Sequence, residues 1–206
     1  MHFDKSLFIY LAIGFILATI IGTITHEFGH CLVATSLGYK AHINYASSWW
    51  TKSYPGQPIS FSDSFLITLG GPLETMLTGT IGLICLFIFR RSFQKSTSLS
   101  FRQWVFIFIA LFWLRQTVNY FVWISTYIFT GQFSDLTDEI HIANYLQLPG
   151  WTIPALTAVL GAIVLTIILL KFIPIKKRLT FIVSAVVGGV TGYITWFYFL
   201  GPKLMP

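Results

Sequence analysis

Near its N-terminus the chain contains twenty consecutive residues without a charge, at positions 6–25. At about 1.5 Å per residue, a helix of that length crosses the hydrocarbon core of a bilayer, which is about 30 Å thick. Four more apolar stretches follow, at residues 61–89, 101–129, 151–170 and 180–200. Only 10% of the residues are charged, whereas soluble domains carry about 25%. The sequence therefore predicts an all-α membrane protein, a polytopic bundle of about five transmembrane helices.

These segments are expected to form a single integral membrane domain over residues 1–206, with the functional core in residues 6–150 and additional helices in residues 151–206. The first apolar run passes into a polar motif without a small-residue cleavage site, so it is predicted to be a retained helix and not a signal peptide. The net charge of +6 is attributed to loops that face the cytoplasm. It does not indicate nucleic-acid binding.

The far part of the first helix carries the most specific pattern in the chain, His26-Glu27-Phe28-Gly29-His30. Residues four apart share one face of a helix, so His26 and His30 can direct two imidazoles at one metal ion. Glu27 can take a proton from a water bound to that metal, and this combination is the zincin signature. The alternative is a pair of histidines whose hydrogen bonds are satisfied by other groups inside the helix bundle. Polar groups on a membrane helix are costly and tend to be functional, which favours the metal site.

Catalytic zinc needs three protein ligands and an open position for water, so a third ligand must come from another part of the chain. The candidates are Asp135, Asp138, Glu139, His141, Glu74 and, more remotely, His42. Asp135 and Asp138 are three residues apart and can share a helical face, so the pattern alone does not separate them. Thr137 can cap a short helix from Asp138 to about Leu146, which Pro149-Gly150 would end.

Residues 38–60 have a different character from the apolar segments around them. In residues 41–45 (Ala-His-Ile-Asn-Tyr) apolar and polar side chains alternate, which is the period of two that strands show. We interpret this region as a small β-hairpin or re-entrant strand region, with a loop as the alternative. An exposed strand edge at Ile43, Asn44 and Tyr45 would pair with an extended peptide.

Two of the later spans contain polar residues in their interiors. Glu74 would be costly against lipid, so it is expected either to line the site or to form a hydrogen bond with a neighbouring helix. Arg115 and Asn119 share a face of the third span. They either hold a substrate backbone near the metal or bind neighbouring helices. We favour the second role for Arg115 and leave both open for Asn119.

Together these features resemble the site-2 protease family of intramembrane zinc metalloproteases, in its compact bacterial form. The resemblance rests on residues 25–30 (Thr-His-Glu-Phe-Gly-His), the strand-like stretch, Gly71-Pro72-Leu73 in the next span and a distal acidic residue before a further helix. It covers roughly residues 8–150. In that family two histidines and a distal aspartate bind zinc, and the glutamate activates water. The resemblance thus implies His26 and His30 as ligands and Glu27 as the general base.

For the third ligand, the resemblance favours Asp138 over Asp135. In the compact members the acid opens a short helix that ends at a proline, and residues 137–149 of this chain resemble that segment. The chain departs from the family in two places. It lacks the Asp-Gly pair of many members, and it has Thr75 where an Asn is common. The resemblance also implies one catalytic Zn²⁺, a membrane-protein substrate with a transmembrane segment, and a bacterial cytoplasmic membrane as location.

The predicted function is therefore hydrolysis of a peptide bond in or near a transmembrane segment. One alternative is a zinc hydrolase acting on a lipid or another non-peptide amide. Others are a catalytically inactive scaffold that binds membrane helices and a metal or proton carrier, since carriers also use buried histidines and acids. The sequence gives no indication of the oligomeric state.

The membrane orientation receives two conflicting indications. Alternation of five spans places nine Lys or Arg residues on the side of the N-terminus and three on the other side. The positive-inside rule then puts the N-terminus in the cytoplasm and the motif toward the outer face. The family resemblance implies a site nearer the cytoplasmic face.

Overall fold

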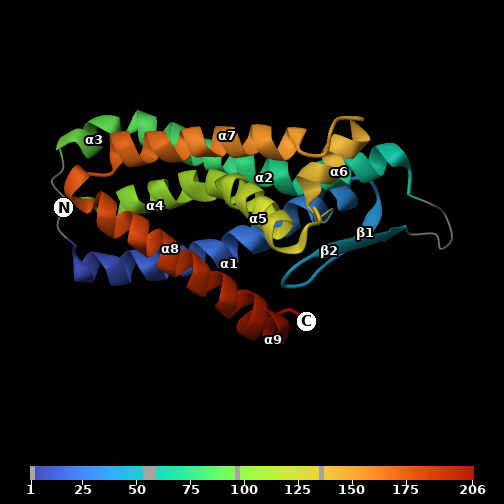
Figure 1. Cartoon of the computed structure of the whole chain (residues 1–206), viewed down its shortest axis with the longest axis horizontal. Coiled ribbons are helices and arrows are strands. Elements are labelled where there is room, and N and C mark those ends of the chain that lie inside the picture. Colours follow the sequence, from blue (N-terminus) through green and yellow to red (C-terminus); the bar gives the residue numbers. More distant parts are fainter. Residues whose placement is uncertain (1–2, 53–58, 96–97, 135–136) are drawn as a thin grey trace.

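The computed structural model describes residues 3–52, 59–95, 98–134 and 137–206 (Figure 1). Within this part of the chain, five helices are long and apolar enough to cross a membrane. They cover Lys5–Ser36, Phe61–Ile88, Phe101–Thr130, Thr152–Phe172 and Ile175–Leu204. A two-stranded sheet follows the first of them. The predicted fold class, a multi-pass helical bundle with a small hairpin, is thereby confirmed.

Helix α1 (Lys5–Ser36) contains the motif near its C-terminal end. It begins after Asp4, whose carboxylate accepts a hydrogen bond from the Leu7 N–H at 3.0 Å and so satisfies one of the free donors of the first turn. It ends before Gly38, whose φ of 85° reverses the chain at little steric cost. The motif thus lies near the end of α1 that leads into the hairpin.

Helix α1 packs against α2 (Phe61–Ile88) on one side and α8 (Arg178–Ile194) on another. Contact with α8 depends on small residues, because a Cβ atom on Gly188 would lie 2.5 Å from the Ala12 carbonyl oxygen. Gly188 therefore allows the backbones of α1 and α8 to approach closely. A buried cluster joins the helices, and it includes Leu11, Phe15, Leu86, Ile107 and Phe181.

Strands β1 (Tyr39–Ile43) and β2 (Ser48–Lys52) form an antiparallel hairpin directly after α1. Ala41 faces Trp50 across the ladder, and Ile43 faces Ser48 next to the turn. The first strand ends at Ile43, so residues 44–47 form the connection. Both strands contact α1, which places the hairpin beside the motif.

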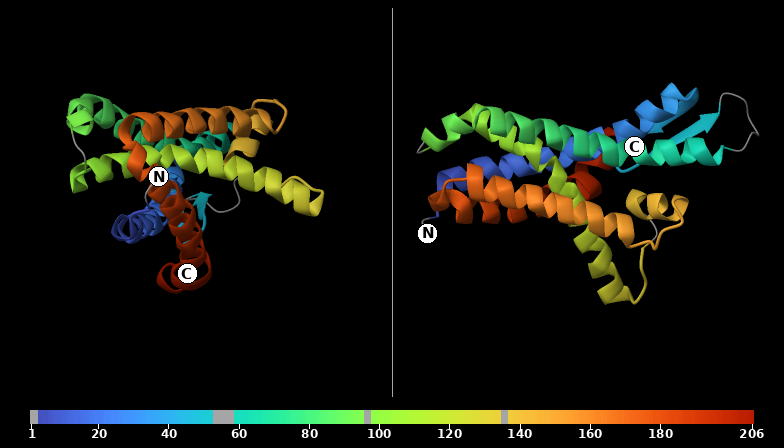
Figure 2. Two further views of the ribbon diagram at one scale, coloured as in Figure 1. Left: turned by 60° about the vertical axis from the view of Figure 1, so that its left-hand side comes forward. Right: turned by 90° about the horizontal axis from the view of Figure 1, so that it is seen from above.

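The third span consists of two helices, α4 (Phe101–Ala110) and α5 (Leu114–Thr130), joined by a short 3₁₀ turn, η1 (Leu111–Trp113). The second half of α5 projects away from the other helices (Figure 2). Helix α6 (Asp138–Tyr145) then brings the chain back against α2 and α7. The divergence of α5 leaves room between this helix and the hairpin.

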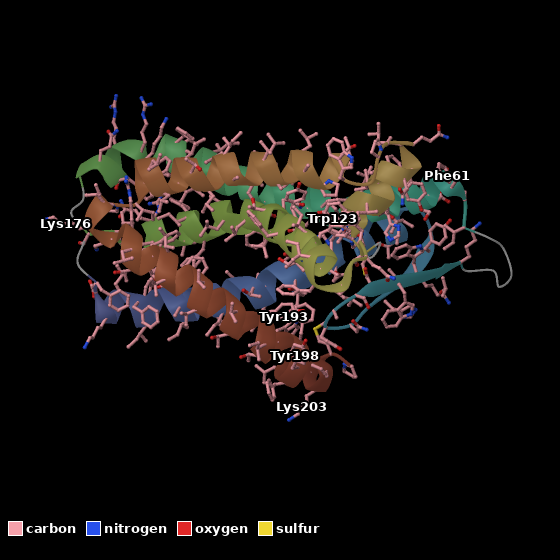
Figure 3. All side chains as sticks on the ribbon, in the orientation of Figure 1. Phe61, Trp123, Lys176, Tyr193, Tyr198 and Lys203 are labelled. Atoms are coloured by element: carbon pink, nitrogen blue, oxygen red, sulfur yellow. The ribbon has the colours of Figure 1, made fainter. Side chains whose placement is uncertain are left out.

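The remaining elements complete the bundle and its far end. They are α3 (Arg90–Lys95), α7 (Thr152–Ile167), the π-helical turns η2 (Ile168–Phe172) and η4 (Thr195–Leu200), the 3₁₀ turn η3 (Ile175–Lys177) and α9 (Gly201–Leu204). The N-terminus, α3 and Lys176 lie at one end of the molecule, and the hairpin, α6 and Phe61 lie at the other (Figures 1 and 3).

Candidate metal centre

The motif lies where α1 and α2 approach most closely. A Cβ atom on Gly29 would lie 2.5 Å from the Gly70 carbonyl oxygen, and one on Gly70 would lie 2.5 Å from the Gly29 carbonyl oxygen. Gly29 of the motif and Gly70 of α2 therefore allow the two helix backbones to come into direct contact. This contact brings His26 and His30 against the segment of α2 around Gly71.

His26 is held at both ring nitrogens. Its Nδ1 lies 3.0 Å from the Thr75 hydroxyl, and its Nε2 lies 2.9 Å from Asp138 Oδ2. The Thr75 hydroxyl donates its own hydrogen to the Gly71 carbonyl at 3.1 Å. Its oxygen is then the acceptor for His26, so the imidazole proton sits on Nδ1 and a lone pair on Nε2 points at Asp138.

His30 has the same arrangement with a different partner. Its Nδ1 lies 2.7 Å from the Ile67 carbonyl oxygen, and its Nε2 lies 3.3 Å from Asp138 Oδ2. The Gly71 N–H is also 3.3 Å from this Nδ1. A carbonyl can only accept, however, so the shorter contact requires the proton on Nδ1. The Nε2 lone pair of His30 is left facing the same carboxylate.

Three acceptors thus converge at one point. The ligand atoms of His26, His30 and Asp138 all lie within 4.8 Å of one another. Two imidazole lone pairs and a carboxylate repel one another unless a cation or a proton lies between them. Tetrahedral zinc with bonds of about 2.0–2.1 Å separates its ligands by roughly 3.3 Å, close to the 2.9 and 3.3 Å observed here. The donor set therefore fits a metal ion.

Asp138 is the first residue of α6, and the start of this helix lies beside the two histidines. Thr137 occupies the predicted N-cap position with extended backbone angles, but its side chain makes no capping hydrogen bond, so that detail of the prediction was wrong. The Oδ2 atom of Asp138 lies 2.9 Å from His26 Nε2 and 3.3 Å from His30 Nε2, so an ion held by the two imidazoles is within reach of this carboxylate.

Glu27 lies beside the converging atoms and is held by the hairpin. Only 8% of its surface is exposed, and its Oε2 accepts a hydrogen bond of 2.9 Å from the Ser48 hydroxyl. Ser48 is the first residue of β2. The hairpin thereby orients the carboxylate that the motif predicts to be the general base.

A cavity of about 360 Å³ opens onto these groups. Helix α1 and the hairpin form one wall, and α5 with the start of α6 forms the other. Asn119, one of the predicted substrate contacts, lies on the second wall with Arg115 and Glu139. Burial, followed by the charge of Asp138, raises the pKa of Glu139. The other lining residues are Ala46, Ser47, Ser48, Trp50, Val122, Trp123, Thr126, Ser134 and Thr137.

The other predicted substrate contacts are not part of this lining. Ile43 pairs with Ser48 in the ladder, and the Asn44 side chain accepts hydrogen bonds from the backbone of residues 46 and 47. The backbone of Tyr45 bonds to Met205 and Trp196. The residues that reach the cavity instead come from the turn and from β2. An Asn followed three residues later by a Ser is a turn signal that would have located this connection.

The other candidate ligands lie elsewhere. Asp135 is outside the described residues. Glu74 accepts a hydrogen bond from Thr78 in its own helix, at 2.9 Å. His42 stacks on Trp49, and His141 is exposed on α6. Within the described part of the chain, the one group of His, Cys, Asp or Glu side chains able to share a metal ion is that of His26, His30 and Asp138.

Comparisons with protein-family models, with curated proteins and with solved structures found no match to this chain.

Proposed function

We propose that this protein is an intramembrane zinc metalloprotease of the site-2 protease type. The observation that carries the proposal is the convergence of both histidine Nε2 atoms on Asp138 Oδ2, with Glu27 in the same cavity. His26, His30 and Asp138 would hold the ion. Two imidazoles, one carboxylate and an open side are the donor set of catalytic zinc.

The charges around the cavity support a divalent ion as well. Among the described lining residues, Glu27, Asp138 and Glu139 contribute three negative charges and Arg115 one positive charge. With all four groups ionised, this leaves a net charge of −2. A net charge of that size in a partly buried site is costly unless it is compensated. One Zn²⁺ compensates it fully.

The chemistry assigns a separate task to Glu27. When bound, zinc supplies a Lewis acid that acidifies a water molecule and polarises the substrate carbonyl. Glu27 accepts a proton from the attacking water and later delivers it to the nitrogen of the breaking C–N bond. The products are a carboxylate and an amine. The hydrogen bond from Ser48 keeps the Glu27 carboxylate in position during both transfers.

The position of the site supports a membrane-protein substrate. The motif lies in α1 and one cavity wall lies in α5, and both belong to helices long enough to span a membrane. A transmembrane helix hides its carbonyls in hydrogen bonds, so the substrate has to unwind locally before it is cut. We propose that the unwound segment lies along Ser48 and Trp50 of β2 and against Asn119, and not along residues 43–45.

The first test is the zinc content of purified protein, measured by elemental analysis. We expect about one zinc per chain in the wild type and in Asp135→Asn, and a large loss in His26→Ala and Asp138→Asn. Loss in Asp135→Asn with retention in Asp138→Asn would instead identify Asp135 as the third ligand. A well-folded wild type that takes up no zinc would refute the protease proposal.

The second test separates metal binding from catalysis. Glu27→Gln should keep its zinc, because Glu27 is not a ligand in this site. Its cleavage of a reconstituted transmembrane peptide should fall by about 10²–10⁴-fold, the usual contribution of a general base. Full function in Glu27→Gln would favour a scaffold or a carrier. Activity on a lipid amide but on no helical peptide would favour the lipid hydrolase.

A further inference from the structure

A cationic side chain in the cavity wall has a buried donor without a partner among the described residues. Arg115 lines the cavity from α5, and its Nε is buried with no hydrogen-bond partner among the described residues. Among the described residues no carboxylate forms a salt bridge with Arg115. A buried guanidinium N–H that lacks an acceptor is costly.

Arg115 lines the same cavity as His26, Glu27 and Glu139, so its charge lies in the wall of the proposed reaction centre. A cation so close to a metal site repels the metal, so it does not serve metal binding. It is better placed to meet negative charge that appears on a bound substrate.

Three other donors in the cavity wall are already engaged. The Ser48 hydroxyl donates to Glu27, the Trp123 indole N–H donates to the Ser134 carbonyl, and the Thr126 hydroxyl donates to the Val122 carbonyl. These three groups cannot also donate to a substrate without breaking a bond. Arg115 keeps its buried Nε–H free.

We propose that Arg115 donates hydrogen bonds to the carbonyl oxygen of the peptide bond that is cut, and that it stabilises the negative charge that develops there. This inference rests on the proposed protease function and deepens it. It also differs from the role as a helix–helix contact that the sequence favoured. Arg115 would be a catalytic residue, because its donors touch the reacting oxygen.

The charge balance of hydrolysis shows when this interaction matters. As the water oxygen bonds to the carbonyl carbon, one proton passes to Glu27 and the carbonyl π electrons move to oxygen. That oxygen then carries the negative charge that Arg115 faces. When the C–N bond breaks, the electrons return to form the new carboxyl group, and the nitrogen takes the proton from Glu27. Arg115 therefore contributes more to the transition state than to the bound peptide.

The test compares zinc-loaded wild type with Arg115→Met and Arg115→Lys on a transmembrane peptide. We expect kcat to fall about 10²–10³-fold in Arg115→Met, with KM changed by no more than a few-fold and zinc content unchanged. Arg115→Lys should recover part of the loss because it restores the charge. The matched control is Arg102→Met, in the first turn of α4, whose guanidinium lies 4.5 Å from the Phe89 ring and which does not line the cavity.

A binding measurement provides a readout that does not depend on turnover. A phosphonamidate peptide, which mimics the charged tetrahedral state, should lose about 10²–10³-fold in affinity for Arg115→Met. The uncleaved peptide should bind Arg115→Met Glu27→Gln as tightly as it binds Glu27→Gln. Free guanidinium should restore turnover to Arg115→Ala, because it can enter the space that the side chain leaves.

Three results would overturn the inference. They are a wild-type kcat in Arg115→Met, loss of zinc in that variant, and equal loss of affinity for the phosphonamidate and the uncleaved peptide. The last two would assign Arg115 a structural role. A wild type without zinc and without cleavage would reject the proposed function and this inference together. A wild type that cleaves, with Arg115→Met as active as Arg102→Met, would reject the inference alone.

Discussion

At the scale of single residues, the absence of a side chain matters as much as the ligands do. A Cβ atom on Gly71 would collide with His30 Nε2 and would lie 2.8 Å from His26 Nε2. Both of these nitrogens are proposed zinc ligands. Gly71 therefore leaves the space in which the two imidazoles turn toward Asp138.

Gly71→Ala tests this role. The added methyl group should displace both imidazoles, remove the zinc and destabilise the protein by about 1–3 kcal/mol, the usual cost of overpacking. Zinc content and thermal unfolding in detergent measure the two effects. Gly189→Ala is the matched control, because a Cβ atom there has no neighbour within 4 Å. Full zinc occupancy in Gly71→Ala would contradict the proposed geometry.

At the scale of elements, the hairpin connects Glu27 to the end of the last span. Its turn is held from that side by two hydrogen bonds, from the Trp196 indole N–H to the Tyr45 carbonyl at 2.8 Å and from the Tyr45 N–H to the Met205 carbonyl at 3.0 Å. On the other side Ser48 bonds to Glu27. The helices beyond residue 150, which lie outside the family resemblance, thus help to position the hairpin over the site.

Trp196→Phe removes one of these bonds and keeps most of the aromatic packing. A hydrogen bond contributes about 1 kcal/mol, so we expect amide exchange in the hairpin, residues 39–52, to become about fivefold faster. Hydrogen–deuterium exchange with mass spectrometry measures the change. Trp151→Phe, at the 58% exposed residue that precedes α7, should leave the exchange unaffected. Equal exchange in both variants would show that the last span does not hold the hairpin.

At the scale of the whole molecule, the basic residues of α3 and Lys176 lie at the opposite end from the candidate metal centre. Lys176 marks the basic end in Figure 3, and α3 and the N-terminus lie beside it in Figure 1. The five long apolar helices agree with the number of spans on which the charge count depends. Because positively charged loops stay in the cytoplasm, we expect the basic end to face the cytoplasm.

Cysteine labelling tests this orientation in a Cys31→Ala Cys85→Ala background. A membrane-impermeant maleimide should label Thr51→Cys, in the hairpin, in intact cells. It should label Lys176→Cys only after the membrane is permeabilised. The opposite pattern would place the metal centre toward the cytoplasm, as the family resemblance implies, and would refute the orientation inferred from charge.

The sequence by itself determined what depends on neighbouring residues. The five spans follow from the length of the apolar runs, and the shared direction of His26 and His30 follows from helical periodicity. The alternation in residues 41–45 predicted a strand after the first helix, and the structure places it two residues earlier, at Tyr39–Ile43. Each of these features depends on residues within one or two turns of one another, so a pattern in the chain specifies it.

Only the tertiary structure decided what depends on distant segments. Asp138 is 112 residues from His26 in the chain, and its contact depends on where α5 leaves the bundle and α6 returns. The same packing brings Arg115 into the cavity, whereas the Glu74 carboxylate accepts a hydrogen bond from Thr78 in its own helix. No local period encodes such contacts, because they result from how several helices bury their faces together. The sequence therefore specified the two candidate ligands on α1 and, through the family resemblance, favoured Asp138, and the fold placed Asp138 beside them.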